Sequence, residues 1–341
     1  MRIELILGLL MTITAAAETQ SISEQLFDDN PGHYNYCPSY LRTHFGTRWI
    51  FYCANENPKE VIDSICFRRK SPFGGWHPRQ IALAPSAEGW DCVHVCDPDV
   101  VRGSFRDGKD CYRYALFYLG CDRLDCTHNQ LGLAVAKRLS GPWKKWHNNP
   151  LITAEQDGFW GVGQPSAVSL DGKGKVLLFY TRGTAVATGM FVSEVDLSDL
   201  SRVALGEEIP LITDGLTERD ERGIILNNGA VALDSKERIL YLVRDRHPSD
   251  PEVPHWISTE VQVAAIPLAD LLSQRGAWNV VANVTPSLTG KPRNHNACIL
   301  RDLYGFLPNR HKLEIAFSVS DLGDDWLWTY RIWSTQLRPS R

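Results

Sequence analysis

The strongest chemical signal in this sequence is a pair of carboxylates, Asp97 and Asp99, on either side of a proline. In an extended strand, residues two positions apart project from the same face. Two carboxylates held close together repel each other, and this repulsion raises the pKa of one of them. A carboxyl group with a raised pKa is suited to general acid–base catalysis. Asp97 is therefore the first catalytic candidate, with a buried structural acid as the alternative.

His295 is the second catalytic candidate and lies among polar neighbours, between Asn294 and Asn296. An imidazole can donate a proton near neutral pH. It can equally bind an ion or water, or hydrogen-bond within the fold, and the sequence leaves these roles open. Further candidate acids stand in polar loop stretches: Asp29, Glu218 and Glu221. For each of these a solvated loop residue is the alternative, and Asp29 can simply cap its own turn.

Asp97 and His295 belong to a short word that occurs five times along the chain. Each word places a polar or small residue ahead of an apolar run. The third residues of the words recur at spacings of 60, 67, 64 and 68: Pro38, Pro98, Pro165, Gly229 and Ala297. An aromatic and β-branched run follows each word, then in most units a further alternating run and a turn, which are signals of consecutive strands. Repeats of this length with four strands per unit are typical of propeller blades.

The repeat therefore predicts an all-β fold, a five-bladed β-propeller with a central channel, forming one domain over residues 18–341. The inner strands are expected near the following residues: 36–41, 97–101, 164–169, 228–233 and 295–300. The last unit contains three strands before the chain ends, so the segment Ile22 to Phe27 is expected to supply the fourth and close the ring. A β-sandwich is the alternative, but the number of strands and their period argue against it.

Two further recurrences fit the same repeat. The word Pro-Leu-Ile-Thr, at 150–153 and 210–213, is expected to form the outermost strand of two successive blades. Three tryptophans that follow Gly-containing turns are expected to pack blades together: Trp76, Trp143 and Trp278.

The first residues, 1–17, have the short apolar run and Ala-x-Ala ending of a secretory signal peptide. The alternative is a buried or membrane-anchoring helix, but the run is too short to cross a bilayer comfortably. The formal net charge of -4 lacks the basic footprint of a nucleic-acid-binding protein. We therefore expect a secreted or periplasmic monomer with neither a nucleic-acid partner nor a membrane partner.

Nine cysteines fit an oxidising compartment and predict disulfides, with Cys121 and Cys126 as the most natural local pair. Cys92, His94 and Cys96 are residue types that bind zinc, at a spacing that resembles one ligand pair of a zinc site. The second ligand pair at zinc-finger spacing is missing, so no metal is assigned to them.

Three stretches of the second unit carry a resemblance to a known family: Asp97 to Val100, Leu116 to Tyr118, and Gly132 to Trp143. They resemble the five-bladed glycoside hydrolases of the family 43 type and their furanoside-cleaving relatives, and the likeness runs over nearly the whole mature chain. The resemblance implies hydrolysis of an O-glycosyl bond by a pair of carboxylates. It also implies three catalytic carboxylates: a general base before a proline in the first inner strand, a pKa-tuning Asp in the second and a general-acid Glu in the third.

Asp97, before Pro98, matches the second of these positions. Cys37 precedes Pro38 at the first position, and its thiol cannot act as an oxygen base. Gln164 stands at the third position, where the resemblance implies Glu. Two of the three carboxylates are replaced, so either other residues catalyse or the site only binds.

The sequence predicts a secreted glycoside hydrolase-like protein that acts on a polysaccharide or oligosaccharide, with a pentofuranoside as one candidate. In this interpretation Asp97 is the base or the pKa-tuning acid, and His295 with Glu218 or Glu221 supplies the proton. Rings that stack on sugars and polar groups that bind hydroxyls are expected among these residues: Asp99, Trp160, Gln164, Asn228, Trp256 and Arg293. No cofactor is expected to be required. The sequence leaves open whether a structural calcium ion binds in the channel.

Other classes of protein stay open as well. A carbohydrate-binding propeller without turnover explains the replaced carboxylates directly, and a pair of acids at the channel mouth would distinguish the hydrolase from it. A third class is an extracellular scaffold held by disulfides. A sialidase is disfavoured, because the stretch Asp321 to Trp326, which resembles an Asp box, occurs once and lacks the initial Ser.

Overall fold

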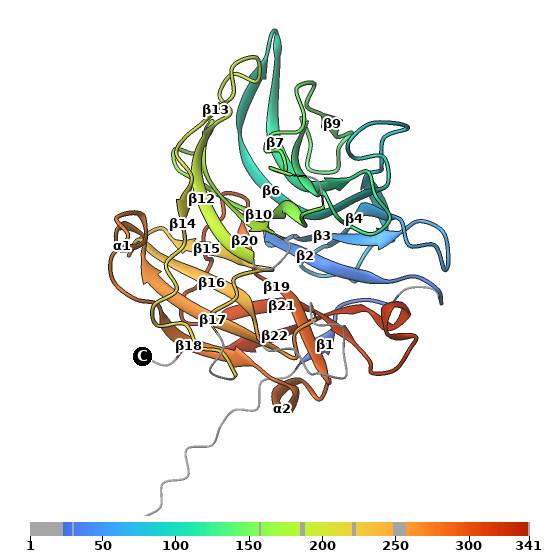
Figure 1. The fold of residues 1–341 in the computed structure, drawn as a ribbon, viewed down its shortest axis with the longest axis vertical. Helices are drawn as coiled ribbons and strands as arrows, with labels where there is room; N and C mark the ends of the chain where they lie inside the picture. Colours follow the sequence, from blue (N-terminus) through green and yellow to red (C-terminus); the bar gives the residue numbers. More distant parts are fainter. Residues whose placement is uncertain are drawn as a thin grey trace, which may run out of the picture.

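The computed structural model describes residues 23–28, 31–156, 158–184, 188–219, 223–247 and 257–339. Over these residues the chain folds into largely antiparallel sheets around a common centre, coloured from blue to red in Figure 1. The described part of the chain contains five such sheets, one per blade, which confirms the predicted all-β five-bladed propeller. The signal peptide expected over 1–17 lies outside the described residues. No helix in the described ranges is long and apolar enough to span a membrane.

The first four blades run in chain order from an inner strand to a short outer one. The first blade contains β2 (Asn35–Arg42), β3 (Arg48–Asn55), β4 (Asp63–Lys70) and β5 (Gln80–Leu83). The second contains β6 (His94–Asp107), β7 (Asp110–Cys121), β8 (Gln130–Ala136) and β9 (Lys144–Lys145). The third contains β10 (Gly161–Ser169), β11 (Lys175–Gly183), β12 (Thr188–Asp196), β13 (Ala204–Leu205) and β14 (Ile209–Pro210). The fourth contains β15 (Ala230–Asp234), β16 (Ile239–Arg246), β17 (Glu260–Pro267) and β18 (Asn279–Val284).

The fifth blade joins the two ends of the described chain. It contains β19 (Arg293–Ile299), β21 (Leu313–Ser320), β22 (Arg331–Leu337) and, at its outer edge, β1 (Glu24–Gln25). Short helical segments connect some strands: α1 (Leu268–Leu272), α2 (Pro286–Thr289) and the 3-10 turn η1 (Trp326–Thr329). Between β19 and β21, β20 (Arg301–Asp302) pairs in parallel with β2, so the fifth blade is also tied to the first.

The predicted closure by the segment Ile22 to Phe27 is confirmed for its described part. β1 pairs with β22, and beyond it the Leu26 N–H donates to the Ile332 carbonyl at 2.9 Å. The Phe27 ring then lies 5.2 Å from the Tyr52 ring of the first blade. Burial of these apolar side chains fixes the amino-terminal segment across the joint between first and last blades.

The repeated word Pro-Leu-Ile-Thr lies where the sequence predicts, along the outer edge of two blades. The Leu151 N–H donates to the Leu131 carbonyl of β8, and the Leu211 N–H donates to the Met190 carbonyl of β12. In both blades the outer strand is interrupted, because the edge chain leaves the ladder after one or two pairs and returns to it at the word.

Apolar faces of neighbouring blades pack against each other and form the core. Phe117 of the second blade and Leu178 of the third, for example, lie fully buried in one cluster. The Trp143 ring meets Phe51 of the first blade edge-on at 5.9 Å, and the Trp278 indole N–H donates to the Ile212 carbonyl at 2.8 Å. These contacts confirm the blade-packing role predicted for Trp143 and Trp278.

A backbone feature repeated in every blade positions the site. One residue near the start of each inner strand has a left-handed backbone: Cys37 (φ 48), Asp97 (φ 48), Gln164 (φ 52), Asn228 (φ 48) and Asn296 (φ 45). In four of the five inner strands the ladder register slips at this residue, which is a β-bulge. A left-handed backbone is strained for side-chain-bearing residues, and such strain gathers at functional sites.

Candidate functional site

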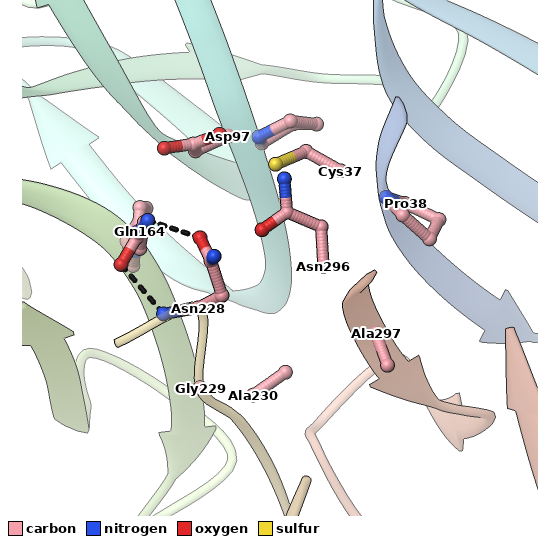
Figure 2. A pocket seen from close by; sticks show the side chains of 11 residues that line it. Cys37, Pro38, Asp97, Gln164, Asn228, Gly229, Ala230, Asn296 and Ala297 are labelled. Atoms are coloured by element: carbon pink, nitrogen blue, oxygen red, sulfur yellow. Dashed lines mark hydrogen bonds between the residues drawn. The ribbon is translucent and has the colours of Figure 1, made fainter. Parts of the chain in front are cut away.

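A pocket opens at the centre of the ring, where the five left-handed residues meet. It is lined from all five blades by these residues and those that follow them: Cys37, Pro38, Asp97, Pro98, Gln164, Pro165, Asn228, Gly229, Ala230, Asn296 and Ala297. Figure 2 shows Asp97, Cys37 and Asn296 pointing into the same space, across from Gln164 and Asn228. Among the described residues that line it, Asp97 is the one carboxylate. The predicted site residues Asp97, Gln164 and Asn228 are therefore brought together.

A chain of hydrogen bonds leads from this lining into the fourth and fifth blades. The Asn228 N–H donates to Gln164 Oε1 at 2.7 Å, and the two side-chain amides are also hydrogen-bonded, as the dashed lines in Figure 2 mark. The Asn228 side chain donates to Asp245 Oδ2 at 2.7 Å. His295 Nδ1 bonds the same oxygen at 2.5 Å, and the Asn296 N–H donates to the other at 3.0 Å. Asp245 thus holds three parts of the site in place.

Asp97 is buried and its charge is only partly compensated. Burial raises the pKa of Asp97 to about 6, and the negative charge of Asp63 adds to the rise. The Cys37 thiol and the Gln164 backbone N–H donate hydrogen bonds to its carboxylate, and together with the charge of His295 they act in the opposite direction. The largest cause is therefore desolvation rather than the repulsion by Asp99 that the sequence suggests.

Asp99 faces away from this pocket, because the bulge after Cys96 breaks the alternation on which the sequence interpretation relies. Its carboxylate accepts hydrogen bonds from the Ser39 hydroxyl at 3.0 Å and from the Ala167 N–H at 2.7 Å, and it pairs with Arg301. Both carboxylate oxygens are engaged inside the fold. The role in substrate binding predicted for Asp99 stays a prediction that this geometry does not favour.

Cysteine sulfur atoms lie next to Asp97 on the side of the first blade. A disulfide joins Cys53 of β3 to Cys96 of β6 and so ties the first blade to the second. The predicted pair Cys121 and Cys126 is wrong, because both are free thiols. The Cys121 thiol instead donates to the Thr127 carbonyl at 3.1 Å, so that the loop closes without a covalent bond.

Aromatic side chains and a second acid–imidazole pair surround the pocket. The Tyr330 ring lies 6.2 Å from the His295 ring and 5.7 Å from the Tyr36 ring. Asp63 Oδ2 lies 2.9 Å from His94 Nδ1. Burial disfavours a charged His94, but its hydrogen bonds, above all to Asp63, raise the pKa of this imidazole to about 10. The Asp63 backbone N–H also lies 3.2 Å from His94 Nδ1, so Asp63 contacts this ring nitrogen through both its backbone and its side chain.

Four other predicted residues lie outside the pocket lining: His295, Glu218, Trp160 and Arg293. His295 is buried directly before the lining residue Asn296. The Glu218 side chain is 2% exposed; it pairs with Arg244 and accepts the His247 N–H at 2.6 Å, which are contacts of a structural residue. Trp160 packs against a cluster that includes Leu119 and the Cys53–Cys96 disulfide. The Arg293 guanidinium lies over the Trp326 ring. The candidates Asp29, Glu221 and Trp256 lie outside the described residues, and their roles stay predictions.

Asp245, Asp63 and the pairing of Cys53 with Cys96 were missed by sequence reasoning. Asp245 ends an apolar strand run in a stretch of alternating charges, and nothing in its neighbours marks it as fully buried. The available signal was positional, because Asp245 and Asp63 stand at the ends of strands that face the pocket mouth. A search for acids on second and third strands of the repeat would have found both.

No protein-family model matches the chain, and no curated protein matches it. Its structure is similar to that of a family 117 glycoside hydrolase from the marine bacterium Zobellia galactanivorans, with a TM-score of 0.61, 13% identity, and coverage of 93% of this chain and 90% of the other. An endo-arabinase from Bacteroides thetaiotaomicron has a TM-score of 0.57 at 13% identity, covering 90% and 95%. An α-L-arabinofuranosidase from Podospora anserina has a TM-score of 0.58 at 11% identity, covering 94% and 97%. The predicted resemblance to five-bladed glycoside hydrolases is thus confirmed at the level of the fold.

Proposed function

We propose that this protein is a carbohydrate-acting propeller that hydrolyses a glycosidic bond at its central pocket. In this proposal Asp97 activates the attacking water and His295 protonates the leaving oxygen. Hydrolysis with inversion requires a base and an acid on opposite sides of the bond. The observation that carries the proposal is the buried contact between Asp245 and His295, because a carboxylate on one ring nitrogen stabilises the protonated imidazole.

The composition of the pocket lining supports this assignment. Asp97 is the one carboxylate among the described lining residues, so it is the group that can take a proton from water there. The amides of Gln164, Asn228 and Asn296 offer both donors and acceptors, which suits the hydroxyl groups of a sugar. His295 itself is buried behind the lining residue Asn296, and its Nδ1 is engaged by Asp245, so the proposal assigns Nε2 to the substrate.

For the substrate we propose an oligosaccharide or polysaccharide, with a pentofuranoside as the first to test. Two of the solved structures that share the fold carry the names endo-arabinase and α-L-arabinofuranosidase. The disulfide between Cys53 and Cys96 supports export to an oxidising compartment.

The test is release of sugar from a panel of aryl pentofuranosides, xylosides and oligosaccharides. We expect turnover by the wild type and a loss on the order of 100-fold or more in Asp97→Asn and in His295→Gln, because each removes a proton-transfer group. Asp110→Asn, at an exposed carboxylate paired with Lys137, is the matched control and should keep full activity. Wild-type rates in a folded Asp97→Asn protein would refute the assignment.

A second candidate is a carbohydrate-binding propeller without turnover. The observation that favours it is the presence of Cys37 and Gln164 at the two positions where the family resemblance implies carboxylates. No release from any substrate, together with a rise in melting temperature on adding one of the oligosaccharides, would support binding and exclude hydrolysis.

A further inference from the structure

Three sulfur atoms and a carboxylate converge at the edge of the pocket. The Sγ atoms of Cys37, Cys53 and Cys96 and a carboxylate oxygen of Asp97 all lie within 4.8 Å of one another. They come from β2 and β3 of the first blade and from β6 of the second, so the sheets hold them in place. Cys53, Cys96 and Asp97 are buried, while Cys37 is partly exposed and lines the pocket.

We infer that Cys37, Cys53, Cys96 and Asp97 form a metal site for a thiophilic divalent cation such as Zn²⁺ when the Cys53–Cys96 disulfide is reduced. Three thiolates and one carboxylate make a four-ligand set of the kind that Zn²⁺ prefers. Zinc–sulfur bonds of about 2.3 Å place tetrahedral ligand atoms roughly 3.8 Å apart. The present separations allow this arrangement once the two bonded sulfurs move apart. The inference does not depend on the hydrolase proposal.

The disulfide and the metal exclude each other, because they use the same two sulfur atoms. A dithiol reductant breaks the Cys53–Cys96 bond in a two-electron exchange, yielding two thiols while the reductant becomes its own disulfide. Metal binding then displaces the protons of the three thiols into solvent, and Asp97 binds as a carboxylate. Reoxidation by a small-molecule disulfide, which is itself reduced to two thiols, re-forms the Cys53–Cys96 bond; the cation is released and Cys37 takes up a proton from solvent. The site is therefore open only in the reduced protein.

Hydrogen-bonding groups surround the sulfur atoms, as is expected around the ligands of a thiolate metal site. The Asp97 N–H lies 2.9 Å from Cys53 Sγ, and the Tyr36 hydroxyl lies 3.1 Å from Cys96 Sγ. Donors at these distances stabilise thiolate charge and orient the ligands. Asn296 Oδ1 lines the same pocket and is buried without a hydrogen-bond partner among the described residues.

Metal uptake by the whole protein tests the inference directly. The protein is reduced with a phosphine under nitrogen, loaded with Zn²⁺ or Co²⁺, and freed of unbound metal. We expect one equivalent per chain in the reduced protein and none in the oxidised protein. Bound Co²⁺ should show a thiolate charge-transfer band and the visible bands of a tetrahedral ion.

Thiol labelling identifies the ligands without any substitution. Loading with Zn²⁺ should slow alkylation of Cys37, Cys53 and Cys96 at least tenfold, as followed by peptide mass spectrometry. Cys111 is an exposed thiol on the hairpin between β6 and β7 and serves as the internal control. Its rate should not change.

Matched variants complete the test. Cys37→Ser keeps both partners of the disulfide and should weaken Co²⁺ binding on the order of 100-fold, while Cys111→Ser should bind as the wild type does. Equal metal binding by oxidised protein, by Cys37→Ser, or at Cys111 would mean adventitious binding and would overturn the inference, as would the absence of uptake. If Cys37→Ser does not fold, the labelling pattern of the wild type still decides.

Discussion

Asp245 and His295 share a buried 2.5 Å contact between Oδ2 and Nδ1, although they lie in neighbouring blades and 50 positions apart in the sequence. Asp245 is completely buried and also accepts hydrogen bonds from Asn228 and from the Asn296 backbone. One carboxylate thus fixes an imidazole and two lining residues at once.

Asp245→Asn is expected to lower kcat on the order of 100-fold while changing KM little. The neutral amide cannot stabilise the imidazolium of His295, so proton donation suffers more than binding. Steady-state kinetics on the best substrate of the panel measures the split. A variant with normal kcat and raised KM would instead indicate that Asp245 only shapes the binding surface.

Asp99→Asn is expected to destabilise the protein by about 3 to 5 kcal/mol, because it leaves the buried Arg301 without its carboxylate partner. Urea unfolding followed by circular dichroism measures the loss. The double variant Asp99→Asn with Arg301→Gln should recover part of it, since no charge then remains unpaired. Normal stability with lost sugar binding would contradict the structural role and favour the substrate contact that the sequence suggests.

Phe27→Ala is expected to lower the free energy of unfolding by about 3 to 5 kcal/mol, because the ring is buried in the joint between the first and last blades. Phe45→Ala is the matched control. Phe45 is 85% exposed, so the same substitution there should change stability by less than about 0.5 kcal/mol. Equal effects of the two variants would show that the amino-terminal segment does not close the ring in solution.

His247 should make stability depend on pH near neutrality. Burial lowers the pKa of His247 below its ordinary value of 6.5, and Asp245 and Glu218 oppose this shift in part. A lowered pKa in the folded state means that the unfolded chain binds the proton more readily. Neutral, buried His247 therefore makes its full contribution to the free energy of unfolding above about pH 6.5. This contribution is lost as the pH falls below that value, by no more than about 1.4 kcal/mol per pH unit.

The variant His247→Gln isolates this effect. In the wild type, His247 Nε2 lies 2.8 Å from Asn227 Oδ1. A Gln side chain at position 247 can still donate a hydrogen bond to Asn227, but it does not titrate. The difference in unfolding free energy between wild type and His247→Gln should shrink as the pH is lowered from 7.5 to about 5. A difference that stays constant over this range would mean that His247 binds its proton equally well in both states.

Local patterns account for what could be predicted from the sequence. The words around Pro38, Pro98, Pro165, Gly229 and Ala297 mark strands and turns, and their period alone predicts the number of blades. The left-handed residues of the ring precede these positions, but Cys37 and Gln164 are not residue types that indicate a positive φ. The bulge, and with it the different directions of Asp97 and Asp99, could not be foreseen.

Contacts between blades account for most of what was missed. Cys53 and Cys96 are 43 positions apart, and their pairing follows from how two sheets pack rather than from spacing along the chain. Cys121 and Cys126 are close in sequence, yet the left-handed backbone at Cys126 and the carbonyl contacts of Cys121 satisfy the loop without a bond. Glu218 illustrates the same limit, since a charged loop stretch gives no sign that one acid turns inward to Arg244.

Arg301 determines from which end of the ring a ligand can reach the pocket. From the strand that links the fifth blade to the first, its guanidinium pairs with Asp99 and donates to the Ala167 and Val231 carbonyls, which belong to the second, third and fourth blades. This side chain plugs the channel beyond the pocket, so a ligand must enter and leave through the same mouth. In the proposed function, a glycan therefore reaches the ring of Cys37, Asp97, Gln164, Asn228 and Asn296 from one end only and does not thread through the molecule.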